Sequence, residues 1–97
     1  MDHWVRALQC PDAKTRRHAA LKLGNVGTAD PAALPALITA LKDRDPDVRR
    51  EAILALVKLG PAARDAVPSL DAIQRHDTTA QVRSYAAKAL AKLRAGD

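Results

Sequence analysis

The sequence has almost no aromatic residues and a single cysteine. It contains one Trp, one Tyr and no Phe, which excludes a core built around packed rings. The apolar side chains are mainly Ala and Leu, and these favour helices that approach one another closely. Cys10 alone cannot form an internal disulfide, and no second cysteine is present to help hold zinc. The composition predicts an all-α fold.

Long apolar runs are also missing. No stretch approaches the roughly 20 apolar residues that are needed to cross a bilayer, and the start of the chain lacks the basic and apolar regions of a secretory signal. We therefore expect a cytoplasmic protein with no membrane association. Charged residues make up 28% of the sequence with both signs interspersed, which is typical of a solvated helical surface. We expect residues 1–97 to form a single domain.

The chain repeats itself with a period of 33 or 34 residues. One shift places Asp12 on Asp45, and a second places Val48 on Val82. Identical pairs under the first shift include Arg16/Arg49, Arg17/Arg50, Ala19/Ala52, Leu21/Leu54, Leu23/Leu56, Gly27/Gly60, Pro35/Pro68 and Leu37/Leu70. The predicted units are 1–11 (partial), 12–44, 45–78 and 79–97 (partial).

Each unit is predicted to contain two antiparallel helices. In the middle unit, Asp45 is a suitable N-cap, Pro46 stands at the first helical position, and Gly60 ends the helix. A second helix follows after a short turn, and short connections make sequential helices antiparallel. The predicted outer helices cover 12–26, 46–59 and 80–94, and the inner helices cover 33–42, 66–75 and, in part, 2–9. No stretch alternates with the period of a strand.

Two runs of the middle unit resemble the HEAT repeats of the phycobilisome-lyase-like type. They are Asp45-Pro46-Asp47-Val48-Arg49-Arg50-Glu51-Ala52 and Leu59-Gly60-Pro61-Ala62-Ala63-Arg64-Asp65-Ala66-Val67-Pro68-Ser69-Leu70. The resemblance extends over nearly the whole chain and implies a right-handed α-solenoid of about three HEAT-like repeats (six helices). Such repeats occur in scaffolds, adaptors, chromophore lyases, a metal-dependent hydroxylase and DNA glycosylases. The resemblance therefore implies a curved recognition surface rather than one activity.

An arginine recurs at one position of all three outer helices. An aspartate precedes the first two arginines by four residues, the spacing at which an acid and a base meet on a helix. We interpret these residues as a structural ladder, and the alternative is that the arginines contact an acidic ligand. The ladder residues are Asp12, Arg16, Asp45, Arg49 and Arg83.

The sequence favours a non-catalytic protein–protein interaction scaffold or adaptor. Its predicted binding surface is the concave face formed by the inner helices. On this face the candidate partner-binding residues are Thr39, Lys42, Asp71, Gln74 and Arg75. The partner is expected to be another protein, and a subunit role in a bilin-lyase-like complex is an alternative.

The net charge of +5 raises nucleic-acid binding as a further alternative. The basic residues fall mainly on the exposed sides of the outer helices, and no aromatic residues lie among them to stack on bases. The inner helices carry no basic excess. Nucleic acid is therefore the less favoured partner.

Catalysis has no support in the sequence. His3, His18 and His76 occupy unrelated repeat positions and none is followed by Glu, whereas the hydroxylase relatives use His-Glu pairs. Ser69 and Ser84 have no His at a related position. We predict no enzyme activity, no catalytic, cofactor-binding or metal-binding residues, and no cofactor.

The C-terminal end departs from the repeat. Lys88 stands where earlier units have Leu21 and Leu54, and Arg94 stands where they have glycine. A terminal helix without a successor must present a polar face to water. We therefore expect a capping helix and an array that ends near Asp97.

The N-terminal end opens with an inner helix that has no outer partner. Trp4 occupies the position of the buried Leu37, so that Trp4 and Val5 can be left partly uncovered. We predict an interface here, either a weak two-fold homodimer through the 2–9 helix or heterologous docking. The alternative is that Trp4 folds back over Ala19 and Leu23.

Overall fold

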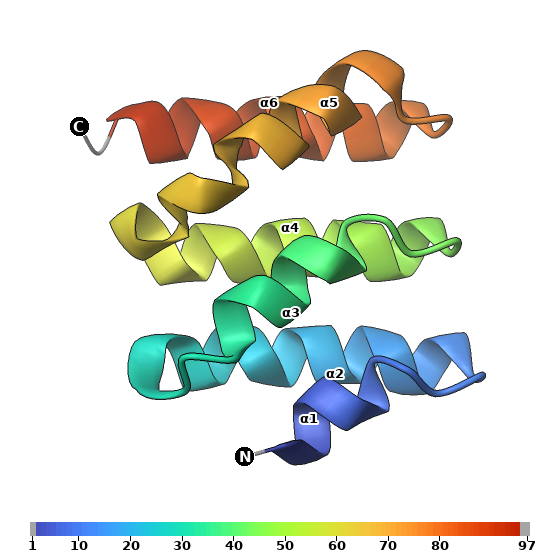
Figure 1. Ribbon diagram of the computed structural model, residues 1–97. Helices are drawn as coiled ribbons and strands as arrows, with labels where there is room; N and C mark the ends of the chain where they lie inside the picture. Colours follow the sequence, from blue (N-terminus) through green and yellow to red (C-terminus); the bar gives the residue numbers. More distant parts are fainter. Residues whose placement is uncertain (1, 96–97) are drawn as a thin grey trace.

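A computed structural model describes residues 2–95, and every regular element in this range is helical (Figure 1). The α-helices are α1 (Asp2–Ala7), α2 (Ala13–Val26), α3 (Ala33–Ala40), α4 (Pro46–Leu59), α5 (Val67–His76) and α6 (Ala80–Ala95). Short 3₁₀ segments, η1 (Gly27–Ala29) and η2 (Gly60–Ala66), follow α2 and α4. The predicted all-α class is confirmed.

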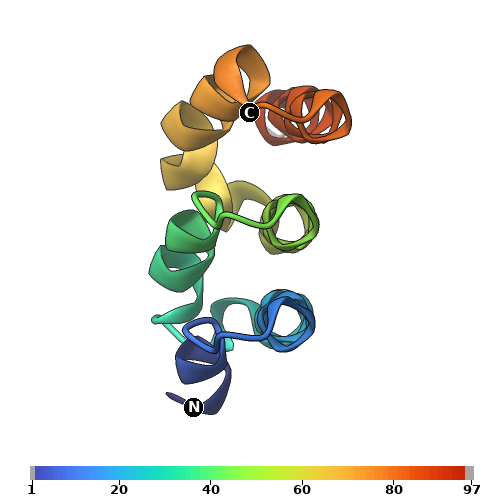
Figure 2. The same cartoon turned by 90° about the vertical axis from the view of Figure 1, so that its right-hand side faces the viewer.

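The helices form two layers of three (Figure 2). α1, α3 and α5 make one layer, and α2, α4 and α6 make the other. Within the second layer α2 packs against α4, and α4 packs against α6. The inner and outer helices predicted from the repeat thus occupy separate layers of a flat stack that measures 31 × 29 × 15 Å.

The ends of α2 and α4 follow from their local sequence. The carboxylate of Asp12 accepts a hydrogen bond from the backbone N–H of Lys14, and that of Asp45 accepts one from Asp47. Both aspartates have extended backbones, as N-cap residues do. Gly27 and Gly60 end the two helices with φ of 64° and 63°, a conformation that glycine adopts without the steric penalty of a Cβ.

Small and branched aliphatic side chains fill the core between the layers. Leu23 and Leu56, the expected centres of the core, are both 0% exposed. The other core positions are mostly Ala and Leu from α2 to α6, including Ala19, Ala20, Leu37, Ala52, Ile53, Ala55, Leu70, Ala86 and Leu90. Because alanine side chains are short, neighbouring helices lie close together, as the lack of aromatics predicted.

Gly24 marks the closest approach of α2 and α4. A Cβ at this position would lie 2.7 Å from the Cβ and 2.9 Å from the Cα of Ala55, so the two helices would have to separate. In an open helix, Gly→Ala stabilises by roughly 0.5–1 kcal/mol. Here we expect Gly24→Ala to lower the free energy of unfolding by about 1–3 kcal/mol through overpacking. Urea denaturation checks this, and a stabilised variant would contradict the close packing.

The position shared by Leu21, Leu54 and Lys88 is not an apolar docking face between repeats, contrary to the prediction. Leu54 is 36% exposed and is the one large apolar side chain in the exposed class among the described residues. Its neighbours Ile53 and Ala55 point into the core, which turns Leu54 toward solvent. Lys88 therefore does not mark the loss of a docking surface. The predicted end of the array near Asp97 lies outside the described residues.

Candidate functional site

Arg16 connects α2 to the loops on both sides of the first complete unit. Its side chain is 4% exposed. Nε and Nη2 donate to the carboxylate of Asp43 at 2.9 and 3.2 Å, and Nη1 donates to the carbonyls of Cys10 and Pro11, each at 2.8 Å. The hydrogen bond to Asp43 raises the pKa of Arg16 above its usual value. This bidentate, charge-assisted pair is the first rung of a ladder.

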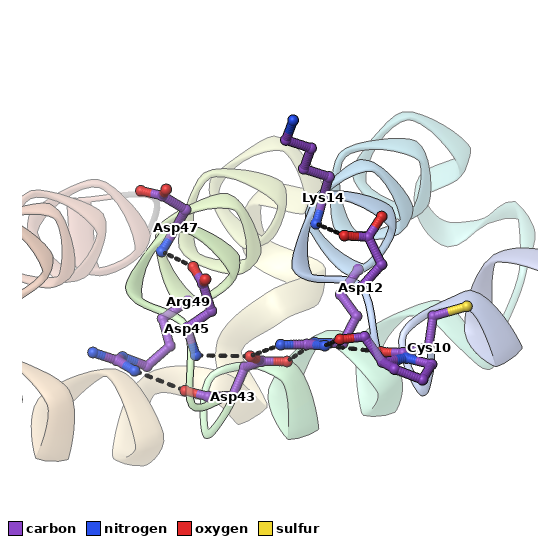
Figure 3. A network of polar contacts seen from close by, with 9 residues as sticks. Cys10, Asp12, Lys14, Asp43, Asp45, Asp47 and Arg49 are labelled. Atoms are coloured by element: carbon purple, nitrogen blue, oxygen red, sulfur yellow. Dashed lines mark hydrogen bonds and ion pairs between the residues drawn. The ribbon is translucent and has the colours of Figure 1, made fainter.

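Arg49 makes the second rung with the same atoms. Nε and Nη2 donate to the carboxylate of Asp77 at 2.8 and 3.1 Å, and Nη1 donates to the carbonyl of Asp43 at 2.7 Å. The side chains of Arg49 and Asp77 are only 11% and 6% exposed. Asp43 therefore takes part in both rungs, through its carboxylate and through its carbonyl (Figure 3).

The two carboxylates of the rungs also shape their own loops. Oδ1 of Asp43 accepts a hydrogen bond from the backbone N–H of Asp45, and Oδ1 of Asp77 accepts one from Thr79, both at 2.9 Å. Each carboxylate thus closes the turn between an inner helix and the next outer helix while it holds the arginine of the preceding outer helix. The rungs couple the spacing of adjacent units to the geometry of these turns.

The pairs that were predicted within one helix, Asp12 with Arg16 and Asp45 with Arg49, are wrong. Asp12 accepts hydrogen bonds from the Lys14 N–H and from the hydroxyl of Thr15 at 3.0 Å, and the Thr15 bond lowers the pKa of Asp12. An N-cap side chain turns back to the first-turn N–H groups, so it points away from the arginine one turn later. The true partners, Asp43 and Asp77, were missed in the sequence.

Arg83 makes only part of a third rung. Its Nη1 donates to the carbonyl of Asp77 at 2.6 Å, which matches the bond from Arg49 to the Asp43 carbonyl. Within residues 2–95 its Nε and Nη2 have no carboxylate partner. The predicted ladder position is thus filled at two places and half filled at the third.

Two grooves run along the surface of α1, α3 and α5 that faces away from the outer layer, which we call the inner face. The larger, of about 970 Å³, lies between α1 and α3. The smaller, of about 460 Å³, lies between the end of α3 and α5. The larger groove has apolar walls and polar residues at one end, with lining residues that include Val5, Leu8, Pro35, Ala36, Thr39, Lys42 and Arg44.

The helical repeats and their arginine rungs agree with the comparison to known families. The family model for HEAT repeats matches residues 1–91. The chain belongs to the HEAT-repeat family. The comparison with curated proteins gives no match. The HEAT assignment accounts for the two layers and for the position of the inner face in the stack.

The HEAT stack brings together only some of the predicted partner-binding residues. Thr39 and Lys42 line the larger groove, and Lys42 also lines the smaller one. Asp71, Gln74 and Arg75 lie on α5 and line neither groove. Arg75 donates its charge to Asp71 in an exposed pair at 3.1 Å. The α5 residues thus form a separate surface beside the grooves of the inner face.

Sequence reasoning missed Arg44 at the rim of the larger groove. Arg44 and Lys42 are both exposed, and within residues 2–95 neither side chain forms an ion pair or hydrogen bond. Arg44 follows Asp43 in the loop between two units, and a loop residue has no helical periodicity to reveal its direction. The rim of this groove therefore carries two uncompensated positive charges.

Trp4 joins α1 to the first hairpin of the HEAT stack. It is partly buried against the core, and its ring meets His18 of α2 edge-on, with centroids 5.2 Å apart. His3 lies edge-on to the same ring at 4.5 Å. Val5 is partly buried and lines the larger groove. Trp4 thus folds toward α2, as one of the two sequence interpretations expected, and self-association stays a prediction.

Other chemistry has little basis among the described residues. No group of three or more His, Cys, Asp and Glu side chains in residues 2–95 is placed to hold a metal ion. Cys10 is a free thiol, half buried beside the larger groove. None of the helices in this range is both long and apolar enough to span a bilayer.

Proposed function

We propose that this HEAT stack is a non-catalytic adaptor that binds another protein on its inner face. The larger groove carries the proposal, because it combines apolar walls from α1 and α3 with Lys42 and Arg44 at its rim. Burial of apolar groups supplies most of the affinity in such a groove, and a few polar groups set the orientation of the ligand.

The charges of the groove favour an acidic partner. Asp43, which also borders the groove, is already bound by Arg16 and by the Asp45 N–H. Lys42 and Arg44 have no such partner in the described part of the chain. A segment with apolar side chains and nearby carboxylates would therefore complement both parts of the groove, and charge complementarity of this kind governs the choice of partner.

Affinity capture from the source organism, followed by mass spectrometry, tests the adaptor proposal. We expect a protein that the parent chain captures to be lost when Lys42→Glu reverses a charge in the groove. Lys14→Glu is the matched control, because Lys14 is an exposed lysine on α2 in the outer layer. Equal capture by the parent and Lys42→Glu, or equal loss with both variants, would refute binding at the inner face.

Nucleic-acid binding is the weaker alternative. Two of the outer-layer arginines, Arg17 and Arg50, lie within 3.7 and 3.8 Å of the Asp47 carboxylate, and Lys58 donates to Asn25. These contacts reduce the charge that is available for phosphates. Salt-dependent binding to unspecific duplex DNA would support this alternative. The phycobilisome-lyase-like subtype and a bilin-lyase partnership would gain support from a pigment that co-purifies.

We also propose weak self-association through α1, centred on Trp4. The support is that Trp4 keeps part of its large apolar surface exposed even though it contacts His18. Sedimentation equilibrium of the parent should show a dimer at high micromolar concentration, and Trp4→Ala should remove it. A parent that stays monomeric over this range contradicts the proposal.

A further inference from the structure

The ladder of arginines contains one position that is built but only half occupied. Arg16 and Arg49 each present two edges: Nη1 bonds a backbone carbonyl, while Nε and Nη2 together bond a carboxylate of the following unit. Arg83 has the first bond and, among residues 2–95, lacks the second. The open edge consists of its Nε and Nη2.

The one bond that Arg83 makes orients its open edge. Arg49 Nη1 donates to the carbonyl of Asp43, and Arg83 Nη1 donates to the carbonyl of Asp77, the corresponding residue of the next unit. With Nη1 held in this way, the Nε and Nη2 of Arg49 meet a carboxylate from the following unit. A planar guanidinium anchored at the same atom presents the same edge, so the open edge of Arg83 faces past α6 and away from α4.

The charge of α6 indicates what this edge can bind. The helix carries Arg83, Lys88, Lys92 and Arg94 and no Asp or Glu between Ala80 and Ala95. A basic helix with an unfilled bidentate donor complements a carboxylate far better than a neutral group or a cation.

We propose that the α6 edge of the stack is a second docking surface, which binds an acidic helix–turn segment of a partner protein through an aspartate on Arg83. The aspartate would take the position that Asp43 has on Arg16 and that Asp77 has on Arg49. This surface lies at the end of the stack and is separate from the grooves of the inner face, so neither proposal depends on the other.

A second copy of this chain is a poor occupant of the α6 edge. If α1 of one copy stacked on α6 of another, the residue at the repeat position of Asp43 would be Cys10. A neutral thiol offers one weak acceptor in place of two carboxylate oxygens. Cys10 therefore disfavours head-to-tail assembly of identical chains, and the occupant is a different protein.

The Cys10 position supplies a probe of known geometry. An unlabelled chain with Cys10→Asp and Arg83→Gln offers a carboxylate at its α1 end and cannot chain onto further copies through its own α6. The matched probe carries Cys10→Asn and Arg83→Gln, which keeps the size of the side chain and removes its charge. Each is added to the ¹⁵N-labelled parent, and the Nε–H signal of Arg83 is followed by NMR.

We expect the Arg83 signal to shift and saturate with the Asp probe, with an apparent affinity at least tenfold higher than for the Asn probe. An equal response to both probes, or no response to either folded probe, would overturn the proposal. Circular dichroism first establishes that the probes are folded.

A peptide gives a second test that does not depend on the folding of a Cys10 variant. The peptide has the sequence of residues 67–79, which includes Asp77 and the turn it closes, and its control carries Asp77→Asn. The Arg83 signal of the parent should move with the first peptide and not with the second. If both peptides leave the signal unchanged up to millimolar concentration, the α6 edge is not a carboxylate-binding surface.

Discussion

Leu56→Ala is expected to lower the free energy of unfolding by about 2–5 kcal/mol. The side chain is 0% exposed and lies in the core between the two layers. Its truncation removes buried methyl groups and leaves a cavity that the rigid helices around it can only partly fill. A stack of this size has a total stability of about 5–10 kcal/mol, so the variant is expected to be close to the limit of folding.

Leu54→Ala is the matched control for Leu56→Ala. The same substitution is made on α4 two residues away, at a side chain that is 36% exposed. We expect a loss below about 1 kcal/mol, as for surface positions without special contacts. Urea denaturation of both variants measures the difference, and equal losses would show that the sides of α4 are assigned incorrectly.

Arg49→Ala is expected to lower the free energy of unfolding by about 2–4 kcal/mol. The substitution leaves the Asp77 carboxylate, which is only 6% exposed, without its bidentate partner. It also leaves the carbonyl of Asp43 without the donor that bonds it at 2.7 Å. Loss of one member of a largely buried ion pair is destabilising because the remaining charge is uncompensated.

The neighbouring arginine serves as the control for the ladder. Arg50 is on the same helix, its side chain is 28% exposed, and its nearest carboxylate atom lies 3.8 Å away on Asp47. Exposed pairs of this kind contribute about 0–1 kcal/mol. Thermal or urea denaturation should therefore separate Arg50→Ala from Arg49→Ala. Equal stability of the two variants would mean that the rung does not hold adjacent units together.

The positions of the helices could be predicted from the sequence because the signals that set them are local. The caps at Asp12 and Asp45, the proline at Pro46 and the glycines that end α2 and α4 all act within a few residues of the helix ends. The period of 33 or 34 residues then placed the helices of one unit on those of the next. Burial of Leu23 and Leu56 followed from this register.

The partners of the arginines could not be predicted in the same way. Arg16 and Arg49 bind aspartates that lie 27 and 28 positions further along the chain, in the turn of the following unit. The nearer aspartates, at the spacing that suits a pair within a helix, are used as N-caps instead. The recurrence of Asp43 and Asp77 two residues before each capping position was the one signal that could have identified them.

The surfaces were also only partly predictable. Thr39 and Lys42 follow the helical period onto the inner face and line the larger groove. Arg44 belongs to a loop, and its position at the groove depends on the turn that Asp43 closes. The outward direction of Leu54 depends on how α4 is rotated between its neighbours, and a count of apolar residues cannot fix that rotation.

The most direct test of the ladder is hydrogen exchange at the Nε–H groups of Arg16, Arg49 and Arg83, measured by ¹⁵N NMR on the isolated chain. The structure predicts slow exchange for Arg16 and Arg49, whose Nε atoms donate to Asp43 and Asp77 at 2.9 and 2.8 Å. It predicts fast exchange for Arg83, whose Nε has no partner within the described residues. Equal exchange rates at all three groups would contradict the account of two complete rungs and one open edge.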